Sequence, residues 1–344
     1  MKFSIGNAPH MPPQTTVAGI MQQVLYALIP GIIAYWWYFG WGILFQLMLG
    51  VGFALFFEWL MLRARGKPVA LFLGDYSAVV TGVLFALCIP PTAPWWITLI
   101  AMLFAIVIAK HLYGGLGHNV FNPAMAGYVV VLISFPAQMT HWLPPQALAV
   151  ESLGFIESLT TILTGTPPGG VGWDAITQAT PLDTIKTGVH GERLISEIRT
   201  APIFGSFGGY GWEWIANWYL AGGLFLLFRR IISWHVPLTV IGTILVLSTM
   251  GSALDQGGTP APILQLYSGG ILLGAFFIAT DPVSGCVSRR GKIIFGIGVA
   301  VLTLVIRRWG GYPDGFAFAV LLMNVAAPFI NLYTRPRAYG HSKD

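Results

Sequence analysis

Charged residues are scarce in this sequence. Only 9% of its 344 residues are charged and 55% are hydrophobic, whereas about a quarter of an average soluble domain is charged. A water-soluble globule needs a charged surface, so this composition excludes that class. The apolar surplus must face lipid or other helices within a membrane. The thirteen Trp and twelve Tyr residues agree, because their rings favour the headgroup layer.

Cysteine is almost absent as well. Cys88 and Cys286 are the only two cysteines and lie in separate apolar stretches, which excludes a disulfide framework and a CxxC motif. An iron–sulfur centre would therefore need cysteines from other chains. The sequence has no HExxH, Walker A, GxGxxG or GxSxG element, so metal-dependent hydrolysis and nucleotide binding are not indicated.

The apolar residues fall into about ten segments, which predict an all-α integral membrane protein. Several segments are shorter than the roughly 20 residues of a spanning helix, so tilted or broken helices must make up the length. The predicted spans are 20–39, 41–62, 77–90, 95–110 and 121–135, then 214–228, 236–250, 268–280, 293–306 and 315–333.

The basic residues lie in small groups between the apolar segments, which is a topology signal rather than a sign of nucleic-acid binding. The N-terminus lacks the pattern of a cleaved signal peptide, and placing it in the cytoplasm puts nearly every basic group inside. Arg307 and Arg308 would lie outside. Either the boundary of that span is misplaced, or the two arginines are surface anchors or functional charges. The groups inside are Arg63, Arg65 and Lys67; Lys110, His111 and His118; Arg229 and Arg230; Arg289, Arg290 and Lys292; and Arg335 and Arg337.

A long polar segment separates the two sets of spans. Residues 136–213 are rich in Thr, Gly and Pro and too long for a connector, so a small folded extracytoplasmic element is expected. The predicted organisation is a first transmembrane repeat in 1–135 with a cytoplasmic N-terminus, this loop in 136–213, and a second repeat in 214–344 with a cytoplasmic C-terminus.

The two sets of spans resemble each other at an offset of about 190 residues. Gly82 aligns with Gly274 and Pro90 with Pro282, within the runs TGVLFALCIPP and LGAFFIATDPV. Because each set has five spans, the second must enter the membrane from the opposite side, which predicts two inverted five-helix repeats with a site at mid-membrane. Chance similarity between apolar helix pairs is the alternative.

Helix-breaking residues near the membrane carry the candidate ion-path residues. Asp281 lies in ATDPVSG and Asp314 in GGYPDG, and a carboxylate there is unfavourable unless it is paired or hydrated. Each therefore has an ion-path role or caps the following helix. The segment Lys110–Ala124 also combines glycines with a proline break, and it is either a ligand-facing break or a plain connector.

The outer loop carries the most informative motif, DAITQATPLDTIKT at Asp174–Thr187. Pro181 biases Thr180 towards an extended backbone that presents its hydroxyl. From the residues alone this is a polar loop in which Asp183 is a candidate helix cap.

Asp174, Thr177, Ala179 and Thr180 match the D-x-x-[ST]-x-A-T pattern at which flavin transferases attach FMN to threonine. With this motif and with runs such as YGGLGHNVFNPAMAGYVVVLISFP and GGYPDGFAFAVLLMN, the chain resembles the D subunits of Rnf ion-translocating electron transport complexes, relatives of the B subunit of the sodium-pumping quinone reductase. The resemblance covers essentially the whole chain. Gln178 departs from the related motif, which has Gly there.

The resemblance implies a multi-pass subunit of the bacterial inner membrane with its flavin loop in the periplasm. FMN would be bound covalently to Thr180, with riboflavin as an additional noncovalent cofactor. The A, B, C, E and G subunits and a flavin transferase are the implied partners. Electrons from ferredoxin- and NAD-linked subunits would pass through the flavin, coupled to Na⁺ or H⁺ transport, with no catalytic side chain in this chain.

Two other functions fit parts of the same sequence. A stand-alone channel or secondary transporter fits the composition and the repeat, but it has no use for a flavin-attachment motif. A structural scaffold for neighbouring redox subunits has the motif, yet predicts no loss of electron flow when the motif is changed.

Overall fold

The computed structural model describes residues 16–255 and 257–334. The predicted cytoplasmic N-terminal segment 1–15 and the basic pair Arg335 and Arg337 lie outside the described residues. Within them the regular secondary structure is helical, apart from one isolated antiparallel bridge between Phe204 and Gly209. This agrees with the predicted all-α class.

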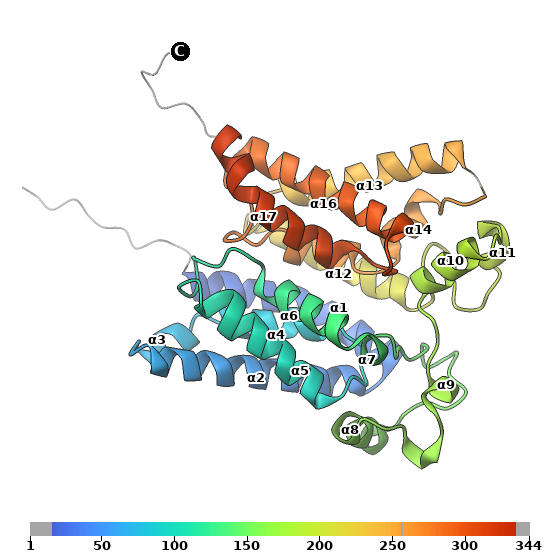
Figure 1. The fold of residues 1–344 in the computed structure, drawn as a ribbon, viewed down its shortest axis with the longest axis horizontal. Coiled ribbons are helices and arrows are strands. Elements are labelled where there is room, and N and C mark those ends of the chain that lie inside the picture. The colour runs from blue at the N-terminus through green and yellow to red at the C-terminus, as the bar shows by residue number, and fades with distance from the viewer. Residues whose placement is uncertain (1–15, 256, 335–344) are drawn as a thin grey trace, which may run out of the picture.

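The first half of the chain forms one group of helices (Figure 1). Their sequences are apolar on nearly all faces, as expected for helices surrounded by lipid and other helices rather than by water. Side-chain caps fix two of the starts, because Thr16 accepts the Gly19 N–H and Asn122 accepts the Met125 N–H. The helices are α1 Val17–Phe39, α2 Gly42–Ala64, α3 Val69–Leu73, α4 Ser77–Ala86, α5 Trp95–Met102, the π-helix η1 Leu103–His111 and α6 Pro123–Ser134.

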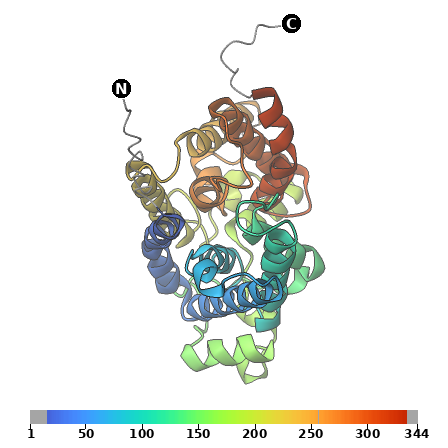
Figure 2. The same ribbon diagram turned by 90° about the vertical axis from the view of Figure 1, so that its left-hand side faces the viewer.

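The second half forms a second group that lies against the first. Figure 2, viewed from the end of the molecule, shows this group in yellow to red above the first in blue to green. Ser288 caps the start of the helix Arg289–Trp309 by accepting the Gly291 N–H. The helices are α12 Trp212–Phe228, α13 His235–Leu254, α14 Pro262–Tyr267, α15 Ile271–Leu273, the π-helix η3 Gly274–Ile278, α16 Arg289–Trp309 and α17 Phe316–Thr334.

The predicted outer loop folds into short helices at one end of the bundle (Figure 1). It has a small apolar core of its own in which Ile185, Ile195 and Ile198 contact Leu264 of the second half. The described chain begins and ends at the opposite end of the bundle. The loop helices are α7 Pro136–Met139, α8 Phe155–Thr164, the 3₁₀-helix η2 Pro168–Gly170, α9 Trp173–Ile176, α10 Pro181–His190 and α11 Ile195–Ile198.

Four of the described helices, α1, α2, α13 and α17, are long and apolar enough to cross a membrane. Shorter apolar helices, among them α4, α5 with η1, and α6, accompany them. Large apolar side chains such as Trp37, Met48 and Phe329 are exposed on these helices, which is unfavourable in water and favourable in lipid. The chain is therefore a membrane protein, while the count of ten spans stays a prediction.

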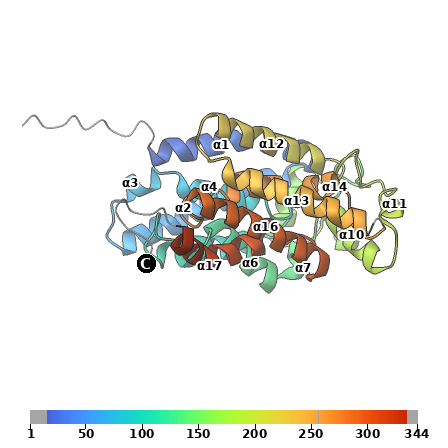
Figure 3. The same ribbon diagram turned by 90° about the horizontal axis from the view of Figure 1, so that it is seen from above.

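The two halves meet along two pairs of helices. α1 packs along α12, and α6 packs along α17 (Figure 3). Small residues allow the closest approaches within a half: a Cβ added at Gly50 of α2 would lie 2.7 Å from the carbonyl oxygen of Gly82 in α4. Glycine therefore brings the backbones of α2 and α4 into direct contact.

Candidate flavin-attachment and ion sites

Thr180 occupies the cap position at the start of α10. Its backbone is extended, with φ −67° and ψ 161°, as the following Pro181 predicts. Its hydroxyl oxygen accepts the backbone N–H of Asp183 at 3.3 Å. The cap is therefore Thr180 itself, and the candidate cap Asp183 instead lies in the first turn of the helix.

The position of this hydroxyl suits a phosphate ester. The first N–H groups of a helix have no intrahelical acceptor and the helix dipole is positive there, so anions are favoured at this end. α10 has ten residues and points this end at Thr180. Thr180 is half-buried, and the neighbouring Ala179 and Gln178 are exposed, so the segment is open to an approaching enzyme.

The other motif residues surround the same segment. Asp174 lies exposed in the first turn of α9, and the Thr177 hydroxyl donates to the carbonyl oxygen of Trp173 at 2.8 Å. Thr177 is thus engaged inside the loop, whereas Thr180 lies at the helix start. Stacking of His141 on Trp173, with ring centres 4.4 Å apart, supports α9. Burial lowers the pKa of His141, and the nearby Asp174 carboxylate partly opposes the shift.

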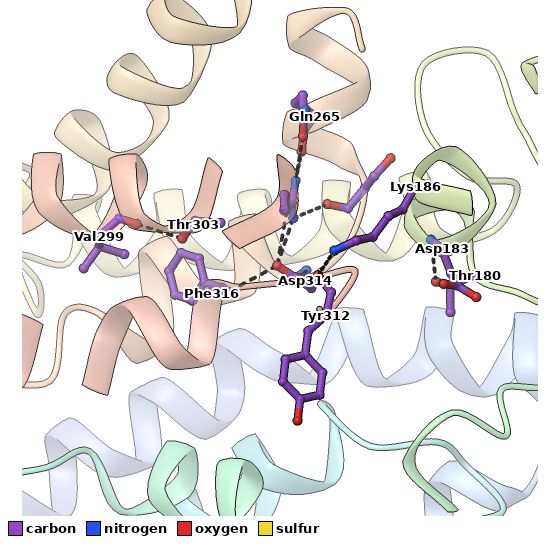
Figure 4. Close-up of polar contacts among 12 residues, drawn as sticks. Thr180, Asp183, Lys186, Gln265, Val299, Thr303, Tyr312, Asp314 and Phe316 are labelled. Atoms are coloured by element: carbon purple, nitrogen blue, oxygen red, sulfur yellow. Dashed lines mark hydrogen bonds and ion pairs between the residues drawn. The ribbon is translucent and has the colours of Figure 1, made fainter. Parts of the chain in front are cut away.

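Lys186 connects α10, the helix that begins after Thr180, to the membrane helices (Figure 4). Its ammonium donates to the carbonyl oxygens of Gly310 and Tyr312, the latter at 2.8 Å, in the turn between α16 and α17. Burial lowers the pKa of Lys186, while Asp183 acts in the opposite direction. These bonds anchor α10 above the turn that contains Asp314.

Asp314 forms a partly buried ion pair with Arg307, one of the two predicted outer basic residues. One carboxylate oxygen is 3.2 Å from Arg307 Nη2, and the other accepts the Gly270 N–H at 2.7 Å. The paired oxygen also accepts the Phe316 N–H at 3.2 Å, at the start of α17. Asp314 is thus both paired and a helix cap, and an additional ion-path role for it stays a prediction.

The same arrangement accounts for the apparent exception to the charge topology. The Arg307 side chain is only 4% exposed and also donates to the carbonyl oxygens of Gln265 at 2.8 Å and Ser268 at 2.9 Å. Arg308 instead pairs with exposed Asp255 at 2.8 Å, which holds the pKa of that carboxyl below its usual range. Both arginines therefore have partners inside the chain.

Asp281 follows the short helix formed by α15 and η3, whose start at Gly270 bonds Asp314. The two carboxylates therefore lie at opposite ends of this helix. The two oxygens of Asp281 accept the Val283 N–H at 3.2 Å and the Ser284 hydroxyl at 2.6 Å, and this side chain forms no ion pair within the described residues. It lines a cavity of about 200 Å³ whose other polar side chains include Lys110 and Asn122. The structure therefore does not bring Asp281 and Asp314 together.

A third cluster, formed by Glu58, Lys110 and His111, was not predicted from the sequence. Glu58 lies within the apolar helix α2, and its Oε2 is 2.8 Å from Lys110 Nζ and 3.2 Å from His111 Nε2, both at the end of η1. The Glu58 and Lys110 side chains are each only 2% exposed. A carboxylate inside a long apolar run is the signal that could have found this site.

Comparisons with known proteins identify relatives over the full length. The family model for NQR2, RnfD and RnfE matches residues 4–340. The D subunit of the ion-translocating oxidoreductase complex of Aliivibrio salmonicida (strain LFI1238) is 47% identical over 350 residues, covering 100% of both chains. The proteins of the same description from Cronobacter sakazakii (strain ATCC BAA-894) and Shigella dysenteriae serotype 1 (strain Sd197) are 48% and 49% identical, over 99% and 100% of this chain and 100% of each relative.

Proposed function

Because the chain belongs to the NQR2, RnfD and RnfE family, we propose that it is a membrane subunit of an ion-translocating electron transport complex that carries FMN covalently on Thr180. The single observation that carries this proposal is the Thr180 hydroxyl at the start of α10, within the Asp174–Thr180 motif. Bound flavin would supply the electron-transfer chemistry, and the chain would set its position.

The residues around Thr180 fit a phosphoester. Pro181 has no N–H and the Asp183 N–H already bonds the Thr180 hydroxyl, so the dipole of α10 is the main feature that favours the phosphate charge. Lys186 fixes α10 on the membrane bundle through the carbonyl oxygens of Gly310 and Tyr312. Asp174, Thr177 and Ala179 would serve recognition by the flavin transferase. The Thr177 hydroxyl is the poorer attachment site, since it already donates to the carbonyl oxygen of Trp173.

We extend the proposal to a noncovalent riboflavin in the 200 Å³ cavity next to Asp281. Apolar side chains of α1 and η3, such as Val24 and Phe277, line the cavity together with the amides of Asn119 and Asn122. A flavin ring has apolar faces and a polar edge, so this lining suits the ring. Because the cavity is smaller than the roughly 300 Å³ of the smallest typical ligand pocket, the ribityl chain would extend outside it. Asp281 at the same cavity is the proposed ion-path residue.

The proposal includes the topology expected for this class. Pairing of α1 with α12 and of α6 with α17 joins corresponding elements of two inverted repeats, which supports ten spans in two five-helix units. Both termini would be cytoplasmic and the flavin loop periplasmic, in the inner membrane. The other subunits of the complex would exchange electrons with this chain, and the transported ion would be Na⁺ or H⁺.

A stand-alone channel or secondary transporter is the competing function. Mass spectrometry of the loop peptide from protein made in a strain with an active flavin transferase separates the two. We expect an FMN adduct on Thr180. An unmodified peptide, or an adduct on Thr184 or Thr187, would refute the proposal.

A further inference from the structure

The buried cluster of Glu58, Lys110 and His111 lies between exposed Arg65 and the cavity that Asp281 lines. On the surface side, exposed Arg65 donates from Nη1 to His111 Nδ1 at 3.2 Å. Because arginine only donates, Nδ1 is unprotonated and the ring proton lies on Nε2, facing the Glu58 carboxylate 3.2 Å away. Within the described residues Nε2 has no well-formed hydrogen bond, so its proton is held only by this neighbouring charge.

On the interior side, Lys110 connects Glu58 to the cavity. Its ammonium donates to Glu58 and to the Ser77 hydroxyl, each at 2.8 Å, and Ser77 donates in turn to Asp75 at 2.5 Å. Lys110 also lines the cavity that contains Asp281. Side chains that can bind and release a proton therefore extend from His111, next to Arg65, to that cavity, with Ser77 and Asp75 beside the path.

The second half of the chain contains a matching site with different chemistry. Arg307, at the end of α16, donates to the carbonyl oxygen of Ser268 near the start of α15, as Lys110 at the end of η1 donates to Ser77 at the start of α4. Arginine stays protonated in proteins, whereas lysine and histidine can each release a proton to a suitable acceptor. The Arg307 site thus keeps a fixed charge, whereas the Lys110 site consists of side chains that can transfer a proton to one another.

We propose that Glu58, Lys110 and His111 form a proton-exchange site between the surface at Arg65 and the cavity at Asp281. A proton entering at His111 Nδ1, once Arg65 moves away, allows the ring to pass its Nε2 proton to Glu58. Lys110 releases one ammonium proton to the cavity and is reprotonated by Glu58. Reorientation of the imidazole then turns its protonated Nδ1 towards Glu58 and its unprotonated Nε2 towards the surface. One proton has then moved from the surface to the cavity, every charge is restored, and the ring can accept the next proton at Nε2.

The chemistry of the cluster favours a proton over a metal cation. The Lys110 ammonium, 2.8 Å from the Glu58 carboxylate, already fills the position that a cation would occupy. The described part of the chain also contains no group of three or more His, Cys, Asp or Glu side chains that could hold a metal ion.

The test uses the whole complex in sealed vesicles and rests on the proposed function, namely that the complex couples electron transfer to ion movement. The double variant Glu58→Gln with Lys110→Met removes both charges together, which a merely structural ion pair tolerates. We expect proton uptake per electron to fall about 100-fold or more, while FMN stays on Thr180. His111→Gln, which keeps a hydrogen-bond donor but cannot relay a proton, should behave alike.

Matched controls separate the possible failures. Arg308→Gln, at the exposed outer pair, should leave proton uptake unchanged. Normal proton uptake in the double variant or in His111→Gln would overturn the exchange site, as would sodium uptake by the unmodified complex without proton uptake. Absence of FMN or of all ion movement in the unmodified complex would instead count against the proposed function.

Discussion

Thr180 combines two roles that substitutions can separate. The hydroxyl caps α10 through its bond from the Asp183 N–H, and in the proposed function it also carries the FMN phosphate. Removing a threonine cap costs about 1 kcal/mol, whereas asparagine caps a helix as well as threonine does. Thr180→Ala should therefore lose the cap and the flavin, while Thr180→Asn should lose the flavin alone.

The size of the cap effect decides what each variant can show. A loss of about 1 kcal/mol in a loop helix that Lys186 also anchors should leave the membrane helices intact. Thr180→Ala should thus insert and assemble in near-normal amounts, and Thr180→Asn in normal amounts. Electron transfer through the complex should fall steeply in both, because no side chain replaces a missing redox carrier.

Ultraviolet fluorescence of the denatured polypeptide in a gel measures the covalent flavin directly. Thr180→Ser keeps both the cap and a hydroxyl and is the matched control, which should retain fluorescence. Thr177→Ala should weaken the modification without abolishing it. Fluorescence that persists in Thr180→Asn, or electron transfer at the normal rate without flavin, would refute the reasoning.

Three further predictions follow from the fold. In a cysteine-free background, a cysteine at exposed Ser152 of the outer loop should react with an impermeant reagent on intact cells and one at exposed Ala64 should not; the reverse pattern would invert the topology. Asp281→Asn should leave a flavinylated, assembled protein with altered ion transport. Normal ion transport in this variant would show that the carboxylate serves only to form the turn. Gly50→Ala should lower the amount of assembled protein, because the new Cβ would lie 2.7 Å from the carbonyl oxygen of Gly82. Gly52→Ala, whose Cβ would meet nothing within 4 Å, should instead stabilise the helix by up to about 1 kcal/mol. Equal amounts of the two glycine variants in detergent extracts would contradict the close packing of α2 and α4.

The Arg307–Asp314 pair shows how a topology rule and a tertiary contact can disagree. Counting charges treats Arg307 as a residue of the wrong membrane face. In the structure its guanidinium is surrounded by Asp314, Gln265 and Ser268, so its position is set by a buried hydrogen-bond network. Because the Asp314 side chain is 26% exposed, removing one partner alone should destabilise the protein by less than the roughly 3–5 kcal/mol of a fully buried pair.

The sequence by itself determined the long apolar helices, the membrane class and the candidate attachment motif. Apolar runs such as 41–62 specify helices locally, because every backbone group in lipid must bond within its own segment. Pro181 likewise fixed the extended backbone of Thr180. The predicted functions of Asp281 and Thr180 follow from such local signals.

Only the tertiary structure decided which charges meet. Glu58 and Lys110 are 52 residues apart in sequence, and nothing in the local pattern of α2 predicts that its carboxylate faces the end of η1 rather than lipid. Asp281 and Asp314 looked equivalent beside their helix breaks, yet only Asp314 has an arginine partner within the described residues. A buried charge is stabilised by the groups that the packing brings within a few ångströms, and those groups come from distant parts of the chain.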